Sequence, residues 1–407
     1  MSDDSLTESS PPQARMAQPR YVSCAFDALY PAGIGFPEAG ELPAGGAVSV
    51  DGAFHGITYL DELYPRVEYG EPFSPAIFAQ DSPSTRNLWT LYETIAVKTA
   101  MSSVVVSVDD AMVYGSVLYA QPSDARAIVY ETYRPNDRPA VAIAPPMLLD
   151  ANAPFDFDDD ADYLFVASAG SANYGHFLVD DAPRLKACAM LRARSSDRRI
   201  VVVMSSFGAG INAVRKDAVL ALAGTPVDVL FLDSTRVYRF RRLYYPSPCS
   251  VHPIEKNPAA LDFVAETLAA DISLAPLMPT KLFIARKAVD GRSLLNLPEL
   301  VARLVDRGFE LVHPEDLTFI EQVTRFACAS VVVGQMGAAM TNTMFCGRDT
   351  TLIYLAPNGW IEPFYWDLAL ARKQNYRALY GQVTTPNVPT HTADFVIAKD
   401  ELLALLD

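Results

Sequence analysis

The stretch SVVVGQMGAAMTNTMF, residues 330–345, decides the fold class. An apolar strand runs into Gly334, Gly337 and two alanines, and a helix is predicted from about Ala338. Small residues at such a junction let a ligand approach the backbone, and a helix start offers free N–H groups and a positive dipole end. The pattern predicts a phosphate-binding turn of an α/β fold, with tight strand-to-helix packing and no ligand as the alternative.

Apolar strands alternate with helices on both sides of this turn. In the C-terminal half we expect strands at 281–285, 309–312, 330–334 and 351–355, with helices from about residues 298, 318 and 338. In the N-terminal half we expect strands at 162–168, 198–206 and 227–233, with helices at 173–194 and 211–223. Continuous apolar strands followed by helices are typical of parallel sheets covered on both faces. The sequence therefore predicts two doubly wound, Rossmann-like domains whose strand ends face a ligand cleft.

Length and composition also favour two domains. The chain has 407 residues, half of them hydrophobic, which is more than one ordinary core holds and ample for two. The predicted division starts with a disordered polar tail at 1–20 and an N-terminal domain at 21–250. The part of that domain up to about residue 150 is expected to be irregular and strand-rich. A linker is predicted at 251–272, next to the proline-rich segment 244–258, and a C-terminal domain at 273–407.

The charge and the cysteines restrict partners and compartment. A net charge of −15 disfavours nucleic acid and anionic membrane surfaces as partners. Five widely spaced cysteines favour reduced thiols. The first residues lack the regions of a secretory signal, and no apolar run is long enough for a membrane span. We therefore expect a cytoplasmic protein without an integral membrane segment.

Two arginines follow the strand predicted at 281–285. Arg286 and Arg292 stand at the end where such sheets bind ligands, and guanidinium forks suit oxyanions. Asn296 is expected either to cap the following helix or to bond a ligand. Ordinary surface charge is the alternative for the two arginines.

An imidazole and a carboxylate share one face of the helix predicted at 173–194. His176 and Asp180 are four residues apart, so their side chains project together and can accept a proton from a sugar hydroxyl. A structural histidine is the alternative. Asp181 and Arg184 extend the polar cluster, although Arg184 is equally expected to pair with a neighbouring aspartate.

Metal and cofactor chemistry has weak support in the sequence. Asp156-x-Asp158 has the form of a manganese site in a sugar transferase, but it precedes a strand, and a solvated acidic turn is the favoured interpretation. The five histidines show no metal-binding spacing. We therefore expect neither a metal nor a cofactor.

A dinucleotide site remains an alternative. Gly208-x-Gly210-x-x-Ala213 lies between a strand and a helix, and Asp233 ends the next strand, where an acidic residue would bind a ribose. The loop before Gly208 is long for this fingerprint. An NAD-dependent oxidoreductase is thus the less favoured reading.

Several stretches resemble glycosyltransferase family 61, of the bacterial capsular polysaccharide type. NYGHFLVDDAPRL (173–185) is similar to the NYGHW…D…PR signature of that family, and GQMGAAMTNTMF (334–345) is similar to its G-x-H-G-A-x-x-x-N-x-x-F signature. FIARKAVDGRSLLN and GFELVHPEDLTFIEQV are similar to the region between them. The resemblance spans about 160–355, with three motifs in the right order.

The resemblance implies a GT-B-like architecture and a metal-independent, inverting transfer from a nucleotide sugar, commonly a UDP sugar. The acceptor would be a glycan or a lipid-linked glycan, in capsular or other surface polysaccharide synthesis. Asp180 is the first choice for the base and His176 the second, and domain closure would exclude water. The resemblance implies as donor-binding residues Arg286, Arg292, Asn296, Gly337 and Asn342, and the predicted diphosphate lies over Gly334 to Ala338. Asn173, Asp181 and Arg184 are predicted on the acceptor side.

Two positions depart from the signature. Met336 stands where the family usually has histidine, and Tyr354 stands where an acidic residue is common. A thioether cannot replace the hydrogen bond that a histidine would donate to the donor phosphates. These departures favour a second alternative, a catalytically inactive scaffold that binds nucleotide sugars.

Overall fold

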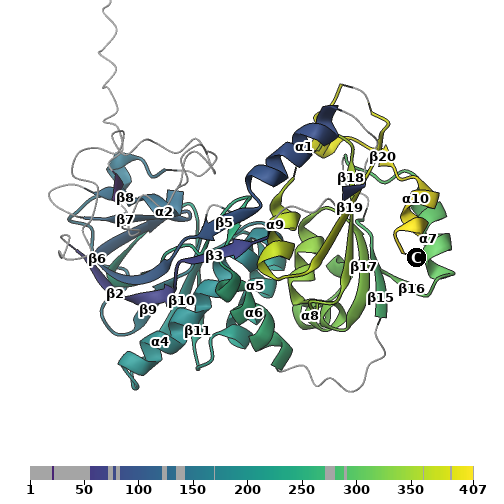
Figure 1. The fold of residues 1–407 in the computed structure, drawn as a ribbon. Helices are drawn as coiled ribbons and strands as arrows, with labels where there is room; N and C mark the ends of the chain where they lie inside the picture. The colour runs from purple at the N-terminus through teal and green to yellow at the C-terminus, as the bar shows by residue number, and fades with distance from the viewer. Residues whose placement is uncertain are drawn as a thin grey trace, which may run out of the picture.

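The computed structural model describes residues 21–22, 56–71, 77–78, 83–121, 126–133, 143–168, 170–270, 280–287, 291–360, 362–385 and 387–406. These residues form a mixed α/β protein with two mixed sheets and a strand-rich N-terminal region (Figure 1). The predicted tail, 1–20, lies outside the described residues. Within them, every helix is too short or too polar to span a bilayer.

The first sheet has the strand order β1-β8-β7-β6-β12-β9-β10-β11, with β2 paired to β6. Its strands are β1 (Tyr21–Val22), β2 (Ile57–Tyr64), β6 (Ser103–Tyr114), β7 (Val117–Ala120), β8 (Ala127–Val129), β9 (Asp162–Phe165), β10 (Ile200–Ser205), β11 (Asp228–Leu232) and β12 (Val237–Pro246). The predicted strands β9, β10 and β11 are parallel, but β6 pairs antiparallel with β2, β7 and β12. The prediction of a doubly wound first domain is therefore wrong, because the N-terminal strands extend the same sheet and make it mixed.

The strand β12 joins these two parts of the sheet. It pairs antiparallel with β6 and lies beside β9 on its other edge. Its arginines bond acidic side chains, including Arg241 to Asp158 and Arg242 to Asp109 at 3.1 Å. The acidic turn that contains Asp158 is thus part of a surface ion-pair network.

The helix predicted at 173–194 is continuous but irregular. It begins as α3 (Tyr174–His176), continues as a π-helical turn, η2 (Phe177–Asp181), and a 3-10 turn, η3 (Ala182–Leu185), and ends as α4 (Lys186–Arg194). Pro183 has no N–H to donate to the preceding turn, which explains the change of winding there. The other helices of this half are α2 (Tyr130–Tyr133), η1 (Pro146–Leu148) and α5 (Ala209–Leu222).

The second sheet has the strand order β16-β15-β17-β18-β19-β20, with β4 paired to β19. Its strands are β4 (Ile77–Phe78), β15 (Thr280–Ile284), β16 (Phe309–Val312), β17 (Ala329–Gln335), β18 (Thr351–Pro357), β19 (Asn375–Val383) and β20 (Phe395–Val396). Strands β15 to β18 are parallel, as predicted, β19 adds a further parallel strand that was not predicted, and β20 is antiparallel. The chain leaves β15 and β17 toward opposite edges, so ligands are expected outside the carboxyl ends of these two strands.

The helices of the second half follow the predicted alternation. They are α7 (Leu297–Val305), η4 (Pro314–Asp316), α8 (Phe319–Ala327), η5 (Ala338–Phe345), α9 (Phe364–Ala371), η6 (Thr390–Thr392) and α10 (Lys399–Ala404). The helix predicted from Ala338 is a 3-10 helix, η5, and not an α-helix.

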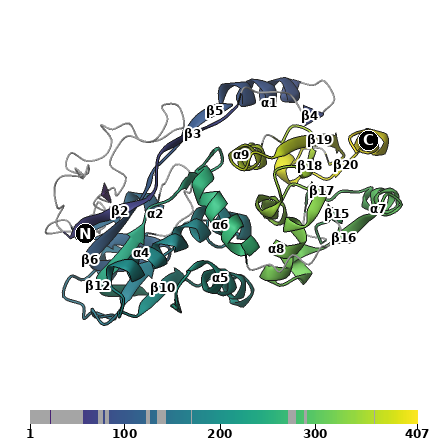
Figure 2. The same cartoon turned by 60° about the horizontal axis from the view of Figure 1, so that its bottom comes forward.

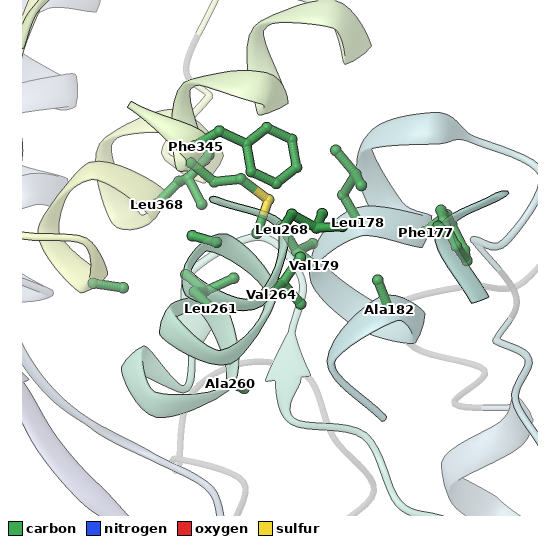
Figure 3. Close-up of a cluster of buried hydrophobic side chains, with 14 of the residues drawn as sticks. Phe177, Leu178, Val179, Ala182, Ala260, Leu261, Val264, Leu268, Phe345 and Leu368 are labelled. Atoms are coloured by element: carbon green, nitrogen blue, oxygen red, sulfur yellow. The ribbon is translucent and has the colours of Figure 1, made fainter. Parts of the chain in front are cut away.

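The described part of the predicted linker 251–272, residues 251–270, is instead folded structure. It contains β13 (Ser250–Val251), β14 (Glu255–Lys256) and the helix α6 (Pro258–Ala270). Figure 3 shows Leu261, Val264 and Leu268 of α6 in one group with Val179 of the first half and Phe345 of the second, and all five belong to one apolar cluster. An interface of this apolar kind resists the predicted domain closure. The GT-B arrangement itself stays a prediction.

An N-terminal segment connects both sheets, and we call β3 (Val67–Gly70), β4, α1 (Pro83–Thr94) and β5 (Val97–Ala100) the bridging arm. β3 and β5 pair with each other, whereas β4 adds to the edge of β19. Both views show α1 reaching from the first half to the second (Figures 1 and 2). Tyr92 of α1 stacks on Trp366 of α9, with ring centres 4.5 Å apart. The N-terminal residues therefore belong to both halves.

A buried charge cluster fixes the bridging arm to α9. The Asp367 side chain is fully buried and lies 2.5 Å from Lys98 Nζ and 2.8 Å from Lys256 Nζ. Tyr69 donates its hydroxyl hydrogen to the same carboxylate at 2.7 Å. Three elements that are distant in sequence thus meet at one carboxylate.

Candidate active site

The two motif segments, 173–185 and 334–345, touch at the junction of the halves. Tyr174 donates its hydroxyl hydrogen to Asn342 Oδ1 at 2.5 Å. A Cβ atom on Gly175 would lie 2.6 Å from Thr341 Oγ1, so only glycine permits this approach. One segment follows the carboxyl end of β9 and the other that of β17. Because the segments touch, these two strand ends lie at the same site.

His176 and Asp180 form a hydrogen-bonded pair, as their spacing predicts. His176 Nδ1 lies 3.1 Å from Asp180 Oδ2, and Ser250 donates to Oδ1 of the same carboxylate. Because a carboxylate only accepts, Nδ1 carries the proton and Nε2 is left as an acceptor. The imidazole is 22% exposed and the Asp180 side chain 3%. His176 therefore presents the basic nitrogen, and Asp180 lies behind it.

A second imidazole adjoins this pair. The ring centres of His176 and His252 are 4.5 Å apart, and Phe364 of α9 lies 6.2 Å and 5.7 Å from them. Ser250 and His252 were not predicted, because they lie in a proline-rich segment without periodicity.

Arg286 and Arg292, which we call the arginine pair, lie together over Gly337. A Cβ atom on Gly337 would be 3.5 Å from Arg286 Cδ and 3.8 Å from Arg292 Nη2. Arg286 Nη1 and Arg292 Nε are buried and have no hydrogen-bond partner in the described part of the chain. Burial lowers the pKa of both guanidinium groups, and the charge of Arg286 lowers the pKa of Arg292 further. Two adjacent cations with unused donors fit an oxyanion.

Two aromatic residues complete the surroundings of the arginine pair. The Arg292 guanidinium carbon lies 4.5 Å from the centre of the Trp360 ring. Burial raises the pKa of the Tyr365 hydroxyl, which also accepts a hydrogen bond from the Gly337 backbone. The sequence did not predict Trp360 or Tyr365, because nothing in their local pattern marks a ligand site.

Residues 174–353 match the family described as Glycosyltransferase 61. The chain carries a glycosyltransferase 61 domain. This confirms the family to which the motifs pointed and implies a glycosyltransferase, which acts on a sugar donor and an acceptor. The chain matches no curated protein sequence. The matched range contains His176, Asp180 and the arginine pair, but it ends before Trp360.

Several residues predicted to bind the donor have structural roles. Asn296 bonds both backbone groups of Ile397, at 2.8 Å and 3.1 Å, and does not cap α7. Asn342 is fully buried and also donates to Gln322 at 2.9 Å. Both predictions of donor contact are therefore unsupported. Ala338, at the start of η5, is half-buried and stays a prediction.

Gly334 serves packing and not ligand approach. A Cβ atom there would lie 2.9 Å from Ile284 Cβ and would also contact the Met340 sulfur. We expect Gly334→Ala to lower the free energy of unfolding by about 1–3 kcal/mol through overpacking, measured in urea. At Gly210 a Cβ atom would meet open space, so the matched variant Gly210→Ala should lose less free energy of unfolding. Equal stability of Gly334→Ala and wild type would contradict this packing role.

The predicted acceptor-side residues also divide by burial. Asp181 and Arg184 are fully buried and bond each other, and Arg184 Nε donates to the backbone oxygen of Asp180 at 2.8 Å. Asp181 and Arg184 support the helix that carries His176. Their burial does not fit the prediction that they contact an acceptor. Asn173 is exposed and caps α3, accepting from Gly175 N at 2.8 Å.

The two departures from the family signature lie in the core. Met336 is fully buried within the apolar cluster that contains Met340. Tyr354 is fully buried, and its hydroxyl lies 2.8 Å from Thr343 Oγ1. Both side chains therefore serve the packing of the core.

Asp233, the predicted ribose-binding acid of a dinucleotide site, instead bonds within its own turn. Gly208 does begin α5, but Asp233 accepts from Thr235 N and Oγ1 at 2.8 Å and 2.7 Å. The buried Arg215 donates to Ser205 O at 2.7 Å and so fills the end of β10. No observation favours NAD. Among the described residues, no three metal-binding side chains gather.

Two surface pockets lie at the other end of the second sheet. One, of about 290 Å³, is lined by Lys281, Phe309 and Val331, and the other, of about 520 Å³, is bordered by Thr280 and Ile320. Thr280, Lys281 and Phe309 begin their strands, so these pockets are remote from the arginine pair.

Proposed function

We propose that this glycosyltransferase takes its sugar from a nucleotide donor whose diphosphate is bound by the arginine pair. The observation that carries the proposal is the buried, unpartnered N–H groups of Arg286 and Arg292 over the Gly337 backbone. They lie at the switch point of the second sheet, where doubly wound folds bind ligands. A uridine diphosphate is the proposed nucleotide, on the family resemblance.

We further propose inversion by a single displacement. His176 Nε2 takes the proton of an acceptor hydroxyl, whose oxygen forms a bond to the anomeric carbon. The bond from that carbon to the phosphate oxygen breaks, and its electron pair stays on the leaving diphosphate. The arginine pair neutralises this charge as it develops, which is the work a metal ion performs in other transferases. The proton remains on the imidazole, which Asp180 stabilises.

Asp180 is thus assigned the orienting role and His176 that of the base, the reverse of the order favoured from sequence. The burial of Asp180 and its bonds from Ser250 and His176 support this assignment. A glycan acceptor and surface polysaccharide synthesis are proposed on the family resemblance, and a cytoplasmic site of action on the cysteines and the features of the first residues.

A thermal-shift panel with UDP, GDP, CMP, NAD and their sugar conjugates tests the donor site. A ligand at 100 times its Kd stabilises by about 2.7 kcal/mol, which raises Tm by roughly two degrees or more. We expect one sugar-nucleotide class to act and Arg286→Ala to abolish its shift.

The neighbouring Lys287→Ala is the matched control. Lys287 is exposed and pairs with Asp316, so its loss should leave the shift intact. If NAD alone raises Tm, or if no nucleotide raises it, the proposed donor site is wrong.

A further inference from the structure

The loop after β18 connects the two groups of the site. Trp360 packs on Arg292, and Phe364, four residues later, lies beside the rings of His176 and His252. Glu362 stands midway between these two aromatic residues in the chain. Its carboxylate is near enough to both Arg292 and His176 for their charges to act on it.

One hydrogen bond orients Glu362. Its Oε1 accepts from Phe364 N at 3.0 Å, which ties the carboxylate to the start of α9. Glu362 forms no ion pair within the described residues, although Lys256, His176 and Arg292 are near enough to influence it. Burial raises the pKa of Glu362, and these basic groups lower it in part. The site thus holds a half-buried carboxylate whose second oxygen is not used by an ion pair.

The proposed reaction places the transferred sugar at this carboxylate. The anomeric carbon is bonded to the phosphate oxygen at the arginine pair, and the attacking hydroxyl comes from the side of His176. The sugar ring must therefore lie between them, next to Glu362. A carboxylate accepts hydrogen bonds from hydroxyl groups, and such charge-assisted bonds are among the strong ones.

We infer that Glu362 binds hydroxyl groups of the transferred sugar and so helps to select the donor. The inference rests on the proposed donor site and adds to it a residue that recognises the sugar and not the nucleotide. Arg286 and Arg292 are proposed to contact the diphosphate, which is present in every sugar conjugate of one nucleotide. Glu362 is proposed to contact the sugar, which differs between these conjugates.

The test compares Kd values for the free nucleoside diphosphate and its sugar conjugate, using the class that stabilises the wild-type protein. For Glu362→Gln we expect the nucleotide Kd to stay within about twofold and the conjugate Kd to rise about tenfold or more. Unchanged nucleotide binding also shows that the variant is folded. Conjugates of deoxy sugars that lack the bonded hydroxyl should bind wild type and Glu362→Gln equally.

Glu315→Gln is the matched control, because Glu315 is exposed on η4 yet acts on the charge of Arg286. It should change neither Kd. Equal weakening of nucleotide and conjugate in Glu362→Gln would show only a change in local charge and would overturn the inference.

A loss of kcat beyond about a thousandfold in Glu362→Gln, with conjugate binding intact, would assign Glu362 to proton transfer and also overturn the inference. If the wild-type protein binds no nucleotide, the proposed function fails and takes this inference with it. If nucleotide binding persists but Glu362→Gln leaves conjugate binding unchanged, only the sugar-binding role fails.

Discussion

Replacement of His176 by glutamine is expected to lower kcat by about 10²- to 10⁴-fold while donor binding stays unchanged. Nε2 of His176 is the acceptor that the Nδ1 bond to Asp180 leaves available. Glutamine cannot take a proton, so only the positioning of the substrates remains. The measurement is the sugar-transfer rate at saturating donor, together with the donor Kd.

Three companion variants separate the base from the group that orients it. The transfer rate of Asp180→Asn should fall at least about a hundredfold, because the amide no longer fixes the productive tautomer of His176. The double variant should be little worse than His176→Gln, since the two groups act as a unit. Free imidazole should restore part of the rate to His176→Ala. Full activity of His176→Gln, or a loss confined to Asp180 variants, would return the role of base to Asp180.

Replacement of Asp367 by asparagine is expected to lower the free energy of unfolding by about 3–5 kcal/mol, measured in urea. The change removes the charged carboxylate that the buried Lys98 and Lys256 both pair with, while Tyr69 loses its charged acceptor. Asp316→Asn is the control, because it breaks an exposed pair with Lys287 and should cost no more than about 0.5–1 kcal/mol.

The stability difference between wild type and Asp367→Asn should also depend on pH. Burial alone would raise the pKa of Asp367, but Lys256 and Lys98 hold it below its ordinary value of 3.8. The carboxylate therefore stabilises the fold fully above pH 3.8, and this stabilisation is lost as the pH falls through the lower folded-state pKa. A difference of less than about 1 kcal/mol at pH 7 would show that the charge cluster does not hold the halves together.

The sequence predicted the elements whose signal is local. β9, β10, β15 and β17 are continuous apolar runs, and the alternation with helices marked them as parallel strands. β12 was missed because its arginines interrupt the apolar pattern, and only their pairing with acidic side chains explains a strand there. α6 was mistaken for a linker, although Asn257 followed by Pro258 is a helix-start signal.

The site could be predicted where spacing or topology alone brings residues together. A separation of four residues joins His176 to Asp180, and the end of β15 places the arginine pair. Asn342 was assigned to the donor on the family resemblance, and Asn296 also because its amide fits a ligand as well as a helix cap. Glu362 comes from a loop whose position is set by tertiary packing, and no local pattern marks it.

The bridging arm determines how this protein can be shortened. Any fragment that starts after residue 272 leaves the edge of β19 without β4 and leaves Asp367 without Lys98. The complementary fragment carries α1, whose Tyr92 has then lost the Trp366 ring that it stacks on. An unpaired strand edge and a bare aromatic face both promote aggregation. Neither half of the chain is therefore a self-sufficient folding unit, and no single cut between the sheets yields two autonomous modules.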